Sequence, residues 1–73
     1  MKKFQNGYLA NIRTTNYLTQ RELAEEAGVS PSALSRIEAG TSKPRLSTLR
    51  KLAAALDVHP DSFFLHPKKE AQA

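Results

Sequence analysis

The chain has 73 residues, 40% hydrophobic and 25% charged, and its 11 Lys and Arg outnumber its 7 Asp and Glu to give a formal net charge of +4. This length suits one small domain, no apolar run approaches the ~20 residues that span a bilayer, and the basic start lacks the apolar segment of a signal peptide. With no cysteine there are no disulfides or thiolate metal sites, which fits a cytoplasmic location, and the positive charge favours a polyanionic partner.

Apolar residues recur at helical spacing along the chain, and no alternating strand pattern is found. Five helical segments are expected, covering residues 6–16, 19–27, 30–39, 45–57 and 60–65. The fourth carries an apolar stripe of Leu46, Leu49, Leu52, Ala53 and Leu56. The fold class expected is all-α, a compact five-helix bundle formed by residues 1–66. Residues 67–73 have little to bury, and we expect a disordered basic tail there.

The boundaries of the second and third segments carry specific signals. Thr19 with Glu22 has the spacing of a capping box, in which each side chain bonds the backbone of the other residue. Ser30 is a good N-cap, and the proline that follows it is tolerated at the first helical position. Gly28 suits the left-handed residue that ends a helix. The two helices are therefore separated by only a sharp turn.

The third segment has two different faces. Ala33, Leu34 and Ile37 share one side of the helix, whereas small and polar residues and one arginine, Arg36, occupy the other. A narrow face of this kind fits the DNA major groove, which is ~12 Å wide and admits one α-helix. The pair of helices therefore has the expected geometry of a helix-turn-helix, with the second helix reading DNA.

Residues 20–29, QRELAEEAGV, are followed by Leu34, Ile37, Glu38 and Gly40 and by a basic loop that ends at Pro44. This combination resembles the Cro/phage-repressor type (XRE-like) of helix-turn-helix domain. The resemblance covers residues 9–65 and implies a lambda-repressor-like fold. It also implies sequence-specific binding of double-stranded DNA by a transcriptional regulator, a repressor in particular, with no cofactor.

The resemblance carries over to particular residues of this chain. Those expected to contact DNA are Gln20, Arg21, Ser30, Pro31, Ser32, Ser35, Arg36, Lys43 and Arg45. Gln20 matches a glutamine that donates to a phosphate and braces the reading helix. Six of them also have a simpler interpretation as ordinary helix, surface or loop residues, namely Gln20, Ser32, Ser35, Arg36, Lys43 and Arg45. Because serines cannot reach far, direct base readout is expected to depend largely on Arg36.

Arg13 and Glu38 match two positions that form an internal salt bridge in such domains. Two residues depart from the family pattern. Tyr17 stands where glycine is frequent, and because tyrosine is strained in a left-handed conformation, Asn16 or a different turn is expected to replace it. Arg45 stands where a capping residue is frequent, and it suits a phosphate contact better than a cap.

One reading helix covers only about half a turn of major groove, so we expect a homodimer on a near-palindromic site. Consecutive phenylalanines cannot easily both face one small core, so an exposed apolar patch is expected near the end of the chain. The candidate interface residues are Val58, Phe63, Phe64 and Leu65.

Other functions have weaker support. Glu25 and Glu26 fit a solvated helix face, and His59 and His66 each precede proline, without the spacing of metal ligands. No nucleophile–base constellation or glycine-rich phosphate loop points to an enzyme. The main alternative is an antitoxin or partner-binding regulator of the same fold that acts through protein contacts.

Overall fold

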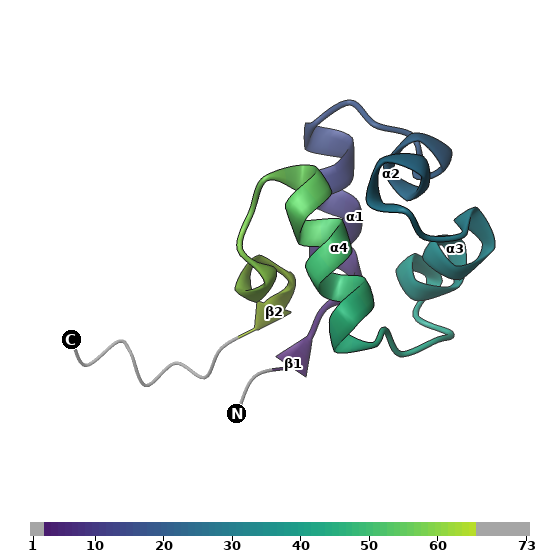
Figure 1. Ribbon diagram of the computed structural model, residues 1–73. Helices are drawn as coiled ribbons and strands as arrows, with labels where there is room; N and C mark the ends of the chain where they lie inside the picture. The colour runs from purple at the N-terminus through teal and green to yellow at the C-terminus, as the bar shows by residue number, and fades with distance from the viewer. Residues whose placement is uncertain (1–2, 66–73) are drawn as a thin grey trace.

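Four α-helices form the body of the molecule in the computed structural model, which describes residues 3–65 (Figure 1). They are α1 (Asn6–Thr15), α2 (Gln20–Ala27), α3 (Pro31–Ala39) and α4 (Leu46–Leu56), followed by a 3-10 helix, η1 (Pro60–Phe63). Two short strands, β1 (Lys3–Phe4) and β2 (Phe64–Leu65), complete the described chain. The expected helical fold is present, but the fifth helical segment is only this 3-10 turn. The expected tail, residues 67–73, lies outside the described residues.

The helix boundaries follow the local signals in the sequence. Thr19 Oγ1 accepts a hydrogen bond from the Glu22 N–H at 3.0 Å, and a Glu22 carboxylate oxygen accepts one from the Thr19 N–H at 2.9 Å. Ser30 Oγ accepts from the Ala33 N–H at 3.0 Å and caps α3. Gly28 has φ +74° and ends α2 in the left-handed conformation. These caps satisfy backbone groups that the helix ends leave unpaired.

The hydrophobic core lies between the helices, each of which contributes one apolar face. Its buried residues are Leu9, Leu23, Ala24, Leu34, Ile37, Leu49, Leu52, Ala53, Leu56 and Phe63. Leu46 departs from the expected apolar stripe of α4, because it is 59% exposed. Within residues 3–65, no helix combines the length and the apolar character that crossing a membrane requires.

The small sheet was not predicted from the sequence. β1 and β2 pair antiparallel, with Lys3 opposite Leu65 and Phe4 opposite Phe64. Each strand has two residues, which is too short to show an alternating pattern. The Phe4 and Phe64 rings meet edge to face, with centroids 5.8 Å apart. The pairing therefore secures both ends of the described chain against the helices.

The turn between α1 and α2 differs from the expectation for Asn16. Tyr17 itself adopts the left-handed conformation, with φ +60°, whereas Asn16 has φ −91°. The Tyr17 side chain is 92% exposed, so packing does not compensate for its backbone strain. The Asn16 amide instead donates to the Ile12 carbonyl at 2.8 Å at the end of α1.

We expect Tyr17→Gly to stabilise the protein by up to about 1 kcal/mol, because relief of left-handed strain exceeds the extra entropy that glycine gives the unfolded chain. Thermal unfolding followed by circular dichroism would then show a melting temperature higher by several degrees. Asp57→Gly is the matched control, because Asp57 has φ +58° but aspartate tolerates this region better. An unchanged or lower melting temperature for Tyr17→Gly would show that the turn is not strained.

Candidate nucleic-acid interface

The outer side of α3 presents a polar face to solvent. Its exposed residues are Pro31, Ser32, Ser35, Arg36 and Ala39, which fall on one side of the helix. On the opposite side, Leu34 and Ile37 are buried in the core. Side chains on the exposed face are short except for Arg36, so the helix can approach another surface closely. The face has the width of a single helix, which the DNA major groove admits.

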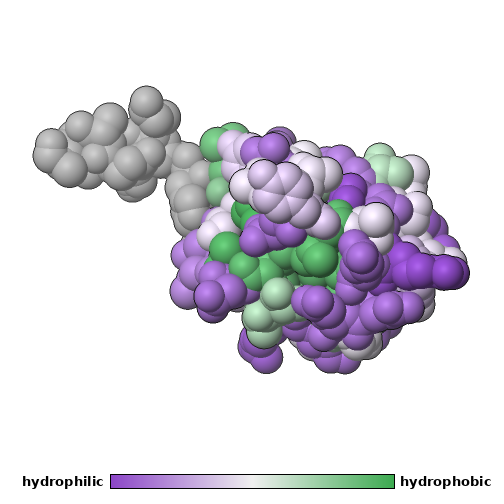
Figure 2. Space-filling model, turned by 90° about the horizontal axis from the view of Figure 1, so that it is seen from above, coloured by the Kyte–Doolittle hydropathy of each residue, from purple (hydrophilic) through white to green (hydrophobic). Residues whose placement is uncertain are grey.

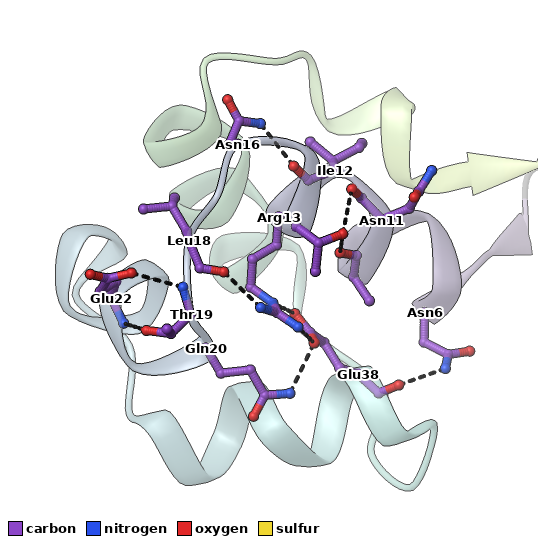
Figure 3. Close-up of polar contacts among 12 residues, drawn as sticks. Asn6, Asn11, Ile12, Arg13, Asn16, Leu18, Thr19, Gln20, Glu22 and Glu38 are labelled. Atoms are coloured by element: carbon purple, nitrogen blue, oxygen red, sulfur yellow. Dashed lines mark hydrogen bonds and ion pairs between the residues drawn. The ribbon is translucent and has the colours of Figure 1, made fainter.

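A partly buried polar network fixes α3 relative to α1 and α2 (Figure 3). Arg13 Nε donates to Glu38 Oε2 at 2.8 Å, and Arg13 Nη2 donates to Glu38 Oε1 at 2.9 Å. The Arg13 and Glu38 side chains are only 14% and 5% exposed. Arg13 Nη1 also donates to the Leu18 carbonyl at 2.7 Å. The ion pair expected from the family resemblance is therefore present, in a two-bond geometry that fixes direction as well as distance.

Gln20 belongs to the same network. Its Nε2 donates to Glu38 Oε1 at 2.9 Å, as Figure 3 shows. A carboxylate can only accept, so Glu38 fixes which end of the Gln20 amide faces inward. The amide nitrogen has two hydrogens, and one remains for a further acceptor. Gln20 thus braces the third helix, and its remaining donor lies at the amino end of α2.

The loop that follows α3 supplies further cations. Gly40 ends α3 with φ +81°, and Lys43 and Arg45 are exposed in the connection to α4. Arg45 is the N-cap residue of α4 but makes no side-chain cap hydrogen bond. The first turn of α4 has neither a side-chain cap nor an acidic residue. Its backbone N–H groups and the Arg45 guanidinium can therefore both donate hydrogen bonds to an anion.

Four cations therefore lie on or near the reading helix. Arg21, Arg36, Lys43 and Arg45 are all exposed, and none of them forms an ion pair with another residue of 3–65. The Gln20–Glu38 bond places the start of α2 against the later part of α3. The predicted DNA contacts are thus divided among three elements, with the exposed side of α3 between the start of α2 and the following loop.

The four residues expected at a dimer interface do not form one exposed patch. Phe63 is fully buried in the core, so its assignment to a surface patch was wrong. Phe64 is half-buried against Phe4. Both phenylalanines find partners inside one chain because the strand pairing places Phe64 against β1. Leu65 is 48% exposed, and Val58 is partly buried.

The remaining candidates also lie apart. The connection that carries Val58 leaves the upper end of α4, whereas β2 lies beside β1 near the other end (Figure 1). Figure 2 shows apolar surface, in green, within the largely polar face at the upper end. Among the four residues, Leu65 has the most exposed side chain.

Some contacts of the site were not predicted from the sequence. Asn6 Nδ2 donates to the Glu38 carbonyl at 2.7 Å and ties the start of α1 to the end of α3. An asparagine at a helix start gives no signal of a partner 32 positions away. The sequence also gives no signal for the Leu18 carbonyl as a partner of Arg13, because every residue has the same backbone carbonyl acceptor.

These features define a helix-turn-helix domain of the DNA-binding class. The helix-turn-helix family matches residues 9–63, and the chain belongs to this family. It is 39% identical over 61 residues, 84% of its length, to the HTH-type transcriptional regulator PuuR of Escherichia coli (strain K12). It is 35% identical over 71 residues, 97% of its length, to SutR, an HTH-type transcriptional regulator of the same bacterium. The chain covers 33% and 39% of these two relatives, respectively.

Solved structures have the same fold. The restriction-modification controller protein C.AhdI from Aeromonas hydrophila superposes with a TM-score of 0.79 at 34% identity, covering 81% of this chain and 89% of that one. SinR of Bacillus subtilis, a master regulator for biofilm formation, was solved in complex with DNA. It superposes with a TM-score of 0.73 at 36% identity, covering 75% of this chain and 89% of that one.

Proposed function

We propose that the chain binds double-stranded DNA through the exposed side of α3 and regulates transcription, most simply as a repressor. The observation that carries the proposal is the polar face of α3, fixed by the Arg13–Glu38–Gln20 network and flanked by exposed cations that form no ion pair within residues 3–65. Phosphate contacts from Gln20, Arg21, Lys43 and Arg45 would give affinity and position. Ser30, Pro31, Ser32, Ser35 and Arg36 would face the groove, with Arg36 reading a base edge. The proposed role is non-enzymatic, and the protein would bind its DNA partner in the cytoplasm.

Selection of bound sequences from a random double-stranded DNA pool tests this proposal. The expected result is enrichment of a defined motif, whose affinity falls steeply with salt concentration in gel-shift titrations. Failure to enrich any motif, combined with weak and equal binding to all DNA, would contradict sequence-specific binding.

We further propose that the chain binds its site as a homodimer, with a near-palindromic operator of half-sites ~34–36 Å apart. Leu65 is the strongest interface candidate, supported by its 48% exposure. Leu65→Ser should weaken binding to the full site more than binding to an isolated half-site. Leu46→Ser is the matched control, because Leu46 is similarly exposed at the start of α4.

Sedimentation of the protein with and without DNA measures the stoichiometry directly. Two copies on a full site would support the dimer, and one copy at every concentration would contradict it. The DNA-binding proposal does not depend on this outcome.

A partner-binding regulator is the second candidate. One similar solved structure is a SinR protein/SinI protein complex, with a TM-score of 0.78 and 34% identity. Under this alternative, the chain acts mainly through contact with another protein, as an antitoxin does. The random-pool selection separates the two candidates, because only the first requires an enriched DNA motif.

A further inference from the structure

A groove of about 740 Å³ opens between β1, the loop after α3, the start of α4 and the η1–β2 segment. Its apolar lining includes Phe4, Leu46, Leu49 and Phe64. None of these side chains was assigned to the DNA-contacting face. The volume falls within the range of small-molecule sites, which is ~300–1,000 Å³. The exposure of Leu46, at 59%, leaves apolar surface in contact with water at this groove.

The groove has a fixed frame. The Phe4–Phe64 edge-to-face pair joins β1 to β2 on one side. On another side, the Asn6 amide bonds the Glu38 carbonyl and lies against Gly40, where an added Cβ would be 3.5 Å from Asn6 Nδ2. The framework is therefore formed by contacts between distant segments and does not require a ligand to assemble it.

The charged residues of the groove are mostly basic. Lys3, Lys43 and Arg50 line it, and all three are exposed. Asp61 is the only acidic residue among the described residues that line it. Apolar lining with an excess of positive charge complements a ligand that has an apolar body and an anionic end.

This charge also argues against two other occupants. A second copy placed on the groove by a two-fold axis would bring the same basic residues near one another. The segment 66–73 has Lys68 and Lys69 against one acidic residue, Glu70, so its sequence does not complement the groove either. DNA would match the charges but would leave the apolar lining without a partner.

We propose that this groove binds a medium-chain carboxylate, with the alkyl chain against Phe4, Leu46 and Phe64 and the carboxylate near Lys43 or Arg50. Lys43 also belongs to the expected DNA contacts. The bound carboxylate therefore competes with a DNA phosphate for Lys43 and weakens DNA binding. This regulatory part rests on the proposed function.

Octanoate titration of the 15N-labelled protein tests the site without DNA. The expected result is saturable shifts of the amide resonances of Phe4, Leu46, Leu49 and Phe64. The matched probes are 1-octanol, which lacks the charge, and octylamine, which reverses it. 1-Octanol should bind about 1.5- to fivefold more weakly than octanoate, the range for one exposed charge contact, and octylamine should bind more weakly still.

Substitutions test whether octanoate binds in the groove or elsewhere on the molecule. Arg50→Gln and Leu46→Ser should each weaken octanoate binding, whereas Lys51→Gln, at an exposed cation of α4 that does not line the groove, should not. Melting curves establish that each variant is folded before its affinity is compared. Absence of saturable shifts at millimolar octanoate, or equal binding of octanol and octanoate, would overturn the proposal. Self-association that produces the same shifts without ligand would also overturn it, since a second copy would then be the occupant.

A gel-shift competition tests the regulatory part separately. Octanoate should reduce DNA binding by the unaltered protein and have less effect on Leu46→Ser. If octanoate binds the groove and leaves DNA binding unchanged, the site stands and the antagonism is wrong. If no specific DNA is found at all, the proposed function fails while the titration result is unaffected.

Discussion

Replacing Glu38 by alanine is expected to lower the free energy of unfolding by about 3–5 kcal/mol. The carboxylate accepts three hydrogen bonds, two from Arg13 and one from Gln20, and its side chain is 5% exposed. Its removal leaves the Arg13 guanidinium largely buried without its charge partner. A loss of this size is large for a small domain, whose total stability is typically about 5–15 kcal/mol.

Thermal and urea unfolding followed by circular dichroism measure this effect. For a domain of this size, each kcal/mol lowers the melting temperature by about 4–8 °C. Glu25→Ala is the matched control, because Glu25 is an exposed glutamate on α2. It should change the melting temperature little. Equal effects of the two substitutions would show that the buried network contributes nothing to stability.

A double-mutant cycle isolates the ion pair itself. Arg13→Ala and Glu38→Ala should each be costly, and the double variant should be less destabilised than their sum. The reason is that removing both partners leaves no unpaired buried charge. Strict additivity would contradict an energetic coupling between Arg13 and Glu38.

Arg36→Ala is expected to cost about 1–3 kcal/mol of binding free energy at the selected DNA site. Arg36 is the only long cationic side chain of α3, and it is exposed on the face proposed to enter the groove. Its guanidinium can donate two hydrogen bonds to one guanine. The loss should therefore be accompanied by relaxed base preference at one position of each half-site.

Titrations of the selected site, its single-base variants and random DNA separate base reading from phosphate contact. Arg45→Ala is the comparison, because Arg45 lies before α4 and is proposed to bind a phosphate. It should weaken binding to all sequences similarly and reduce the salt slope by about 1. If Arg36→Ala lowers affinity for specific and random DNA equally, Arg36 contacts a phosphate and does not read a base.

The two substitutions also test different levels of the structure. Glu38→Ala acts on the framework, so its DNA-binding defect should follow from unfolding or from a misplaced α3. Arg36→Ala removes an exposed side chain and should leave the melting temperature nearly unchanged. A large drop in stability for Arg36→Ala would undermine the assignment of this residue to the surface.

Local physics explains why much of the fold could be predicted from the sequence. The capping box of Thr19 and Glu22, the Ser30 cap and the left-handed Gly28 all depend on residues within a few positions of one another. The apolar face of α3 likewise follows from helical spacing, which places Leu34 and Ile37 together. The spacing that buries these residues also exposes Ser32, Ser35 and Arg36.

The ends of the described chain could not be predicted in this way. The phenylalanines at 63 and 64 look like an exposed pair because no local pattern reveals a two-residue strand. Pairing with β1, more than fifty positions away, turns Phe64 against Phe4 and lets Phe63 enter the core. Tyr17 shows a related limit, since the tertiary structure holds it at φ +60° despite its local preference.

By itself, the sequence determined the helix starts, the buried face of α3 and the polar face proposed to meet DNA, because these depend on short-range spacing. The family resemblance implied the Arg13–Glu38 pair and a bracing role for Gln20, but only the tertiary structure showed that Gln20 and Asn6 both bond Glu38. It also decided that Leu46 would be exposed beside an apolar groove. The physical reason is that such contacts join segments distant in the chain, and their energies are realised only when the whole core has packed.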